Sequence, residues 1–254
     1  MIEKRRKINN EIRKYFSVKY SKFLSYLSYL CGCNNYLNMK KSLLTTLIFL
    51  FSLTTFSQNF LPEIKTFESK DSVDMPAKGQ ILLAGSSTFR LWTTYKTDLS
   101  EFSVINRGFG GSQMSDLNYY FDRIVVKYEP KMILVYEGDN DLGAGENPDS
   151  VIREFKEFVQ MVKLKLPKTK VVFCSIRPSL LRISILDKQR TVNQAIASFC
   201  KYQKRVYYLD IQKDFYLPNG ELMNDIFVAD KLHMNQKGYG IWAEATRKFL
   251  RKKF

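Results

Sequence analysis

Five short apolar runs constrain the fold of this chain more than any other feature. They lie at residues 80–84, 102–106, 131–136, 170–176 and 205–209. Stretches with helical spacing of apolar side chains come between and after them, at 114–128, 148–166, 186–202 and 240–250. Strands this continuously apolar are buried on both faces, so the pattern predicts one parallel sheet with helices on each side. The carboxyl ends of the strands then share one edge, where sheets of this kind bind their ligands.

The residues before this region have the layout of a secretory signal peptide. Lys40 and Lys41 precede an apolar segment at 43–56, and small residues at 55 and 57 predict cleavage before Gln58. We assign 39–57 to the signal, which predicts a secreted or periplasmic protein with no stable membrane span after cleavage.

The predicted signal also sets the domain limits. Residues 1–38 are interpreted as a non-native extension that arises from the choice of start site. The alternative is a genuine basic extension ahead of a signal anchor. Residues 58–78 are expected to form an irregular lead-in, and residues 79–254 to form a single domain.

The net charge of +15 is unevenly distributed. Residues 1–57 contain ten basic and two acidic side chains, a net +8, which leaves +7 for the rest of the chain. The C-terminal segment 247–254 is the most basic part of that remainder. A helix that ends in basic residues is usually a solvated face that also complements the helix dipole. We therefore predict that nucleic acid is not a partner.

The cysteines and the histidine do not form a metal-binding pattern. The chain has four cysteines and one histidine, with no CxxC pair, so a zinc finger is excluded and no metal or other cofactor is predicted. Cys174 lies in an apolar run and Cys200 in a helical stretch. We expect both to be buried free thiols, with a disulfide between them as the alternative.

Two serines follow the first apolar run. Ser86 and Ser87 come directly after Gly85, at the predicted turn from strand to helix. A serine on such a turn presents its hydroxyl outward, beside backbone N–H groups that stabilise developing negative charge. The alternative is a helix N-cap, which serine often provides.

Polar or small residues also follow the second and third runs. A glycine cluster at 108–111 could bring backbone N–H groups close to a ligand, or could satisfy turn angles only. The cluster is not GxGxxG, so a dinucleotide site is not supported. Asn140 follows the third run and could donate its amide N–H into a cleft, with an Asx turn as the alternative.

The only histidine of the chain, His233, lies just before the last helical stretch. Asp230 precedes it by three residues, close enough to accept the Nδ1–H and fix the tautomer of the ring. A lone histidine is more often structural than catalytic. The neighbouring Asp230 and the position just before the last helical stretch favour a catalytic base.

These residues resemble the four sequence blocks of the SGNH/GDSL hydrolases. Ser87 in ILLAGSSTFRLW is similar to the block-one serine, and Gly111 in INRGFGGSQMSDL to the block-two glycine. Asn140 in YEGDNDL matches the third block, and Asp230 with His233 in VADKLHMNQKGY match the Asp-x-x-His block. The resemblance covers residues 79–250 and preserves the spacing of all four blocks.

The resemblance implies a flavodoxin-like three-layer α/β/α sandwich with a five-stranded parallel sheet. It also implies hydrolysis of ester or thioester bonds without a metal. One departure is Ser86, which gives GSS where the family often has GDS. The GSS form is familiar in one branch of the family.

On this basis the sequence predicts a serine ester hydrolase. Ser87, His233 and Asp230 are the predicted nucleophile, base and orienting acid. The predicted oxyanion donors are the backbone N–H groups of Ser87 and Gly111 and the side-chain amide of Asn140.

The predicted substrates are short acyl esters, including O-acetyl groups on carbohydrate, because the sequence has no long apolar insertion for a lid. Arg90 and Arg177 are predicted to line the substrate pocket, with solvated surface charges as the alternative. Two other functions remain open: a lysophospholipase or thioesterase acting on lipid, and a non-catalytic binding protein with a basic surface on the same fold.

Overall fold

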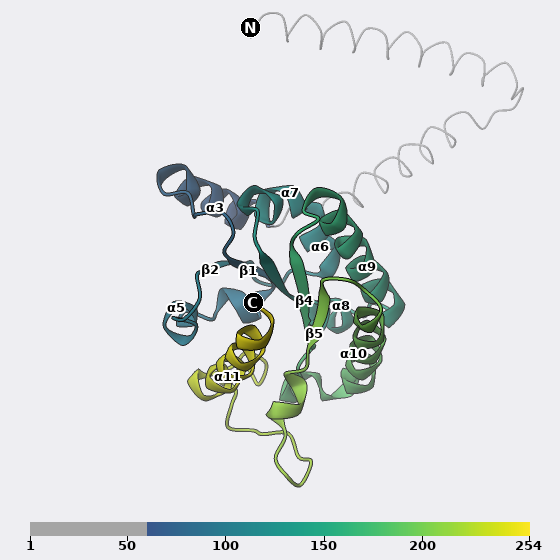
Figure 1. Ribbon diagram of the computed structural model, residues 1–254. Helices are drawn as coiled ribbons and strands as arrows, with labels where there is room; N and C mark the ends of the chain where they lie inside the picture. The colour runs from purple at the N-terminus through teal and green to yellow at the C-terminus, as the bar shows by residue number, and fades with distance from the viewer. Residues whose placement is uncertain (1–59) are drawn as a thin grey trace, which may run out of the picture. The chain divides into compact units, whose positions relative to one another are not determined.

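A parallel five-stranded sheet forms the centre of the domain (Figure 1). The computed structural model describes residues 60–254, so the predicted extension at 1–38 and the predicted signal at 39–57 lie outside the described residues. The strands run in the order β2-β1-β3-β4-β5, and every neighbouring pair is parallel. This is the flavodoxin-like order, so the predicted fold class is confirmed. The strands are β1 Ile81–Gly85, β2 Val104–Gly108, β3 Met132–Tyr136, β4 Lys170–Cys174 and β5 Val206–Leu209.

Both faces of the sheet are buried under helices, which is why the strands read as continuous apolar runs. Along β1, Leu82 and Ala84 face one apolar core, while Ile81 and Leu83 face the other. Helices α3, α6, α7, α9 and α10 contribute to the first core, and α4 and α11 to the second. Figure 1 shows α11 on one side of the sheet and α9 and α10 on the other.

The helices connect the strands as right-handed crossovers require, and most are short. Their bounds are α3 Leu61–Val73, α4 Ser87–Arg90, α5 Tyr95–Asp98, α6 Met114–Tyr119, α7 Phe121–Ile124, η2 Val126–Tyr128, α8 Asp139–Gly143, α9 Pro148–Lys165, η3 Leu180–Ile185, α10 Leu186–Lys201, η4 Gln212–Phe215 and α11 Gln236–Lys253. The predicted helices at 148–166 and 186–202 correspond closely to α9 and α10.

The lead-in at 58–78 differs from the prediction, because it contains the helix α3 rather than irregular chain. Only Ile64 and Asp71 of α3 are buried, so its sequence has little apolar periodicity. Ion pairs fix it to the domain instead. Asp71 pairs with Arg107 and Lys127, and Glu68 accepts two hydrogen bonds of 2.7 Å from Arg123.

The stretch 114–128 is three short helices rather than one. Tyr120 and Val125 have backbone angles outside the α-helical range, and they separate α6, α7 and η2. The apolar side chains Leu117, Phe121 and Ile124 still reach the first core. The spacing therefore located the buried residues correctly but did not reveal the breaks.

Cys174 and Cys200 are both free and buried, as predicted. Cys174 belongs to the core under α11, and Cys200 to the core under α9 and α10, on the opposite face of the sheet. Burial raises the pKa of both thiols, that of Cys200 to about 12. Two neutral thiols on opposite faces of a sheet do not pair.

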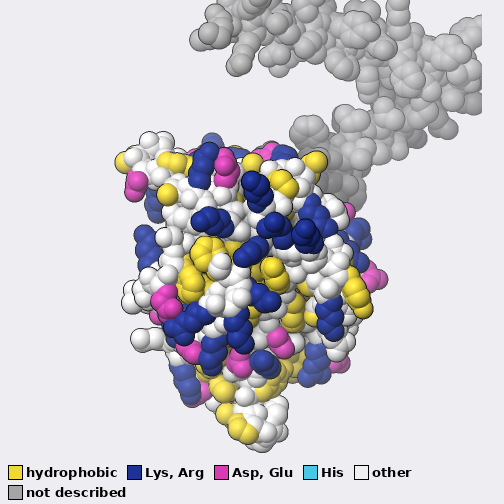
Figure 2. All heavy atoms as spheres, viewed as in Figure 1, with side chains coloured by type: hydrophobic (Ala, Val, Ile, Leu, Met, Phe, Trp, Pro, Cys, Tyr) yellow, Lys and Arg dark blue, Asp and Glu magenta, His cyan; other side chains and the backbone are white. Residues whose placement is uncertain are grey.

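The basic side chains lie among residues of other types on the face that Figure 2 shows. Figure 2 shows Lys and Arg mixed with acidic and apolar side chains over one face. Several cations of the last helix have acidic partners: Arg251 pairs with Glu101, and Lys248 with Glu244. Such pairing reduces the field that would attract nucleic acid. In the part of the chain that is described, no helix is long and apolar enough to cross a membrane.

Candidate active site

The turn after β1 places Ser87 at the edge of the sheet. Gly85 has a φ of 143°, and a Cβ there would lie 2.2 Å from the carbonyl oxygen of Tyr136, so only glycine fits. The chain then enters α4, whose first residue is Ser87. The N-cap residue, Ser86, makes no capping hydrogen bond through its side chain. The hydroxyl of the next residue, Ser87, lies against the ring of His233.

His233 bridges Ser87 and Asp230. Its Nε2 lies 3.0 Å from Ser87 Oγ, and its Nδ1 lies 2.6 Å from Asp230 Oδ2. The carboxylate on Nδ1 holds the proton there, which leaves the Nε2 lone pair facing the serine hydroxyl. The geometry thus brings together three residues that are separated by up to 146 positions in the sequence.

The loop around Asp230 is shaped to present this carboxylate. Lys231 adopts a left-handed φ of 58°, and Asp230 Oδ1 accepts the backbone N–H groups of Leu232 and His233, both at 2.9 Å. Partial burial raises the pKa of Asp230, but the hydrogen bonds from the His233 ring and from these two N–H groups outweigh it and lower the pKa to about 2. Asp230 is therefore a carboxylate at any pH near neutrality.

The three predicted oxyanion donors are the backbone N–H groups of Ser87 and Gly111 and the side-chain amide of Asn140, which follow β1, β2 and β3 respectively. Within residues 60–254, no acceptor is paired with the N–H of Ser87 or of Gly111. Gly111 follows β2 with a φ of 86°, and Asn140 lies in α8, after β3. The Asn140 Nδ2 donates one hydrogen bond to the carbonyl oxygen of Ser112 at 2.9 Å, which leaves its second N–H available.

Arg182 fixes the orientation of the Asn140 amide, and the sequence analysis did not identify it. Its Nη2 donates to Asn140 Oδ1 at 3.1 Å, and its Nη1 pairs with Asp139 Oδ2 at 2.9 Å. The oxygen of the amide is thereby turned to Arg182 and the nitrogen to the other side. The two residues are 42 positions apart, so no local sequence signal connects them.

The two predicted pocket arginines lie in different surroundings. Arg177 is only 1% exposed, and its Nη2 donates to the carbonyl oxygen of Leu232 at 2.8 Å. The surface-charge alternative is therefore wrong for Arg177, which anchors the loop of His233, and its contact with substrate stays a prediction. Arg90 lies on the surface and faces Glu63 at 3.6 Å, so its contact with substrate stays a prediction.

A group of three carboxylates near the site is the one candidate metal-binding cluster within the described residues. Ligand atoms of Asp141, Glu146 and Glu154 all lie within 4.8 Å of one another. Asp141 already accepts the N–H groups of Met114 at 2.8 Å and of Gly138 at 3.0 Å. Burial and the neighbouring Glu146 and Asp141 raise the pKa of Glu154 to about 7. Protonation of Glu154 thus relieves its repulsion with Glu146 and Asp141. The two hydrogen bonds that Asp141 accepts connect the loop after β2 to the loop after β3.

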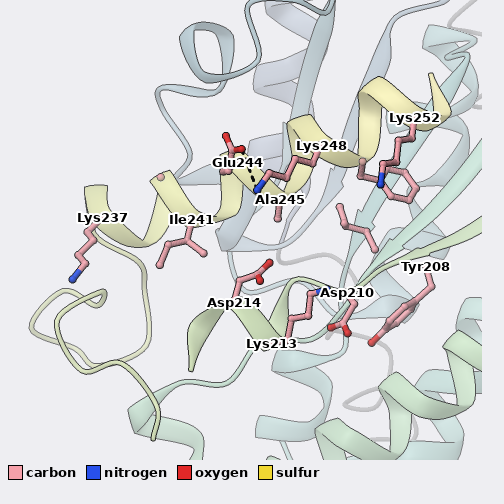
Figure 3. Close-up of a pocket in the computed structure, with 13 residues that line it drawn as sticks. Tyr208, Asp210, Lys213, Asp214, Lys237, Ile241, Glu244, Ala245, Lys248 and Lys252 are labelled. Carbon is pink, nitrogen blue, oxygen red and sulfur yellow. Dashed lines mark ion pairs between the residues drawn. The ribbon is translucent and has the colours of Figure 1, made fainter. Parts of the chain in front are cut away.

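A separate hollow lies between α11 and the segment that follows β5 (Figure 3). Its volume is about 780 Å³, and lysines and acidic residues alternate around it. Neither Ser87 nor His233 lines it. This hollow therefore does not include the predicted nucleophile or the predicted base.

The fold and the strand-end residues together define a class, the SGNH-type α/β hydrolases. Residues 82–241 match the model of the GDSL-like lipase/acylhydrolase family. The chain belongs to this family and is a carboxylic ester hydrolase, so the recognition made from the sequence blocks is confirmed. Comparison with curated protein sequences gives no match.

Solved structures of low sequence identity share the fold. A protein from Streptococcus pneumonia described as a platelet activating factor is 19% identical, with a TM-score of 0.67 over 80% of this chain and 98% of that one. A GDSL-like lipase from Bacteroides thetaiotaomicron is 19% identical, with a TM-score of 0.62 over 75% and 98%. A carbohydrate esterase family 3 protein from Talaromyces cellulolyticus is 19% identical, with a TM-score of 0.58 over 68% and 97%.

Proposed function

We propose that the protein is a secreted serine esterase that removes short acyl groups, including O-acetyl groups of carbohydrate, through Ser87, His233 and Asp230. The observation that carries the proposal is the continuous contact from Ser87 Oγ to His233 Nε2 and from Nδ1 to Asp230. A serine hydroxyl is weakly nucleophilic until an adjacent base takes its proton, and this arrangement supplies that base.

In the acylation step, Ser87 Oγ bonds to the carbonyl carbon of the ester while its proton passes to His233 Nε2. The carbonyl electron pair moves to the oxygen, and the N–H groups of Ser87 and Gly111 and the amide of Asn140 bind that oxyanion. Each donor of this kind typically contributes about 3 kcal/mol of transition-state stabilisation. The carbonyl then re-forms, the bond to the alcohol oxygen breaks, and His233 returns its proton to the leaving alkoxide.

Deacylation repeats these steps with water. A water molecule gives a proton to His233 Nε2 and bonds to the acyl carbon of the acyl-enzyme. The bond to Ser87 Oγ breaks, the serine recovers its proton, and the carboxylic acid leaves. Asp230 stays ionised throughout and stabilises the imidazolium, in agreement with its pKa of about 2.

Two features support short acyl groups and secretion. The sequence lacks a long apolar insertion for an acyl tunnel, and the signal-like segment at 39–57 supports export. The carbohydrate esterase from Talaromyces cellulolyticus shares the fold, which makes carbohydrate acetyl groups a natural substrate to test. N-terminal sequencing of the protein exported by its own cells checks the predicted start at Gln58.

The decisive assay compares p-nitrophenyl acetate, butyrate and octanoate, with the Ser87→Ala variant as control. We expect turnover that depends on Ser87 and falls with acyl length, followed by release of acetate from acetylated xylan. Greater turnover of octanoate, or of lysophosphatidylcholine, would support the alternative of a lipid acyl hydrolase. Equal inertness of both proteins on every ester would support the non-catalytic alternative.

A further inference from the structure

The first turn of α3 lies against the loop that carries Gly111. Glu63 Oε2 accepts the backbone N–H of Gly110 at 3.0 Å. The ring of Phe60, just before α3, packs edge-to-face on Phe109 with the centroids 5.2 Å apart. A segment more than forty residues upstream therefore contacts the two residues that precede the predicted oxyanion donor.

The same carboxylate also reaches the helix that carries the nucleophile. Glu63 Oε1 lies 3.6 Å from Nη1 of Arg90, which is three residues after Ser87. The guanidinium of Arg90 packs directly on Gly110, where a Cβ would lie only 2.4 Å from Arg90 Nε. One oxygen of Glu63 thus faces the last residue of α4, and the other faces the loop after β2 that leads to Gly111.

The rest of α3 holds Glu63 in a fixed place. Asp71 is 5% exposed and binds Arg107, Lys127 and the hydroxyl of Tyr128. Glu68 binds Arg123 in a two-bond contact. These anchors lie in the middle of α3 and in its last turn, so they explain how α3 is attached without accounting for the contact with Gly110.

We propose that Glu63 is a positioning residue of the oxyanion site: by accepting the Gly110 N–H, it sets the direction of the next N–H, that of Gly111. The inference rests on the proposed function, because it assigns to that function a residue outside the matched range 82–241. Each peptide group is a rigid plane, and the plane that carries the Gly110 N–H is joined to the plane that carries the Gly111 N–H only through φ and ψ of Gly110. Because glycine leaves these two dihedrals unusually free, anchoring the first plane by a hydrogen bond removes part of the freedom of the second. A donor helps a transition state only where it already points at the developing charge.

The test compares Glu63→Ala with Glu63→Gln and with a matched control, Glu68→Gln, on the same helix. Ser87-dependent hydrolysis of p-nitrophenyl acetate gives kcat and KM, and thermal unfolding gives the effect on stability. Hydrogen exchange of the Gly110 amide, followed by NMR, gives a readout that does not depend on activity.

We expect Glu63→Ala to lower kcat by about tenfold with KM nearly unchanged, less than the loss of a whole donor because the N–H is misdirected rather than removed. Glu63→Gln keeps an oxygen for Gly110 and should recover most of kcat. Glu68→Gln should lower the melting temperature and leave kcat within twofold. The Gly110 amide should exchange faster in Glu63→Ala only.

Two results would overturn the inference: a kcat within twofold of wild type in Glu63→Ala, or equal losses of kcat in Glu63→Ala and Glu68→Gln. If wild type and Ser87→Ala are equally inert, the proposed function fails instead. In that case amide exchange still decides whether Glu63 orders the loop, since unchanged exchange at Gly110 refutes the positioning role by itself.

Discussion

Replacing Asp230 by Asn separates the orienting role of this residue from its structural role. The carboxylate makes two kinds of contact: Oδ1 accepts the N–H groups of Leu232 and His233 at 2.9 Å, and Oδ2 lies 2.6 Å from the ring Nδ1. An asparagine keeps one oxygen for the two backbone donors, so the loop is expected to fold unchanged. Its Nδ2, however, then faces the ring with a donor.

The consequence for the ring is a change of tautomer. A donor opposite Nδ1 requires an unprotonated Nδ1, which places the proton on Nε2, 3.0 Å from Ser87 Oγ. A protonated Nε2 cannot accept the serine proton. A change of this kind lowers kcat by about 10⁴-fold in serine proteases, equivalent to about 5.5 kcal/mol in the activation free energy. We expect a loss of similar size here.

The assay measures kcat/KM for p-nitrophenyl acetate in wild type, Asp230→Asn and Ser87→Ala, together with thermal unfolding of each. The expected result is a melting temperature within a few degrees of wild type and an activity close to the Ser87→Ala background. If Asp230→Asn keeps more than a tenth of the wild-type activity while Ser87→Ala is inactive, the tautomer argument is refuted.

Four further outcomes follow from the structure. Asn140→Ala should lower kcat by about a hundredfold with little change in KM, and Arg182→Met, which frees the amide to turn, should show a smaller loss in the same steady-state assay. Phe155→Ala should lower the free energy of unfolding by about 3–5 kcal/mol in urea titrations, because this fully buried ring packs on Phe173 at 4.8 Å. Burial raises the pKa of Asp141 to about 6, above its ordinary 3.8, so the folded state holds this proton more tightly than the unfolded chain. Protonated Asp141 therefore adds up to about 3 kcal/mol to the free energy of unfolding below pH 4, and this stabilisation is lost as the pH rises through 6. Denaturant titrations at pH 4.5 and 7.5 should detect the loss. Equal free energies of unfolding at the two pH values would contradict the prediction.

The sheet and the order of its polar strand ends could be predicted from the five apolar runs. Strands that are buried on both faces are apolar at nearly every position, so the apolar runs predict where the strands begin and end. The bounds of each run differ from those of its strand by no more than two residues. Since the carboxyl ends of parallel strands lie at one edge, Ser87, Gly111 and Asn140 could be assigned to the same edge of the sheet from the sequence. Asp230 and His233 could be paired from sequence because they lie three positions apart.

The contacts between segments that lie far apart in the chain emerge only in the folded structure, because local sequence does not encode the paths of these segments over the sheet. α3 has few apolar side chains, and its helix depends on Arg107, Arg123 and Lys127, all far along the chain. Whether an arginine is buried under a loop, as Arg177 is, or orients an amide, as Arg182 does, depends on where other loops cross. A charged side chain has no periodicity that reveals its partner, and only the folded backbone brings that partner within hydrogen-bond distance.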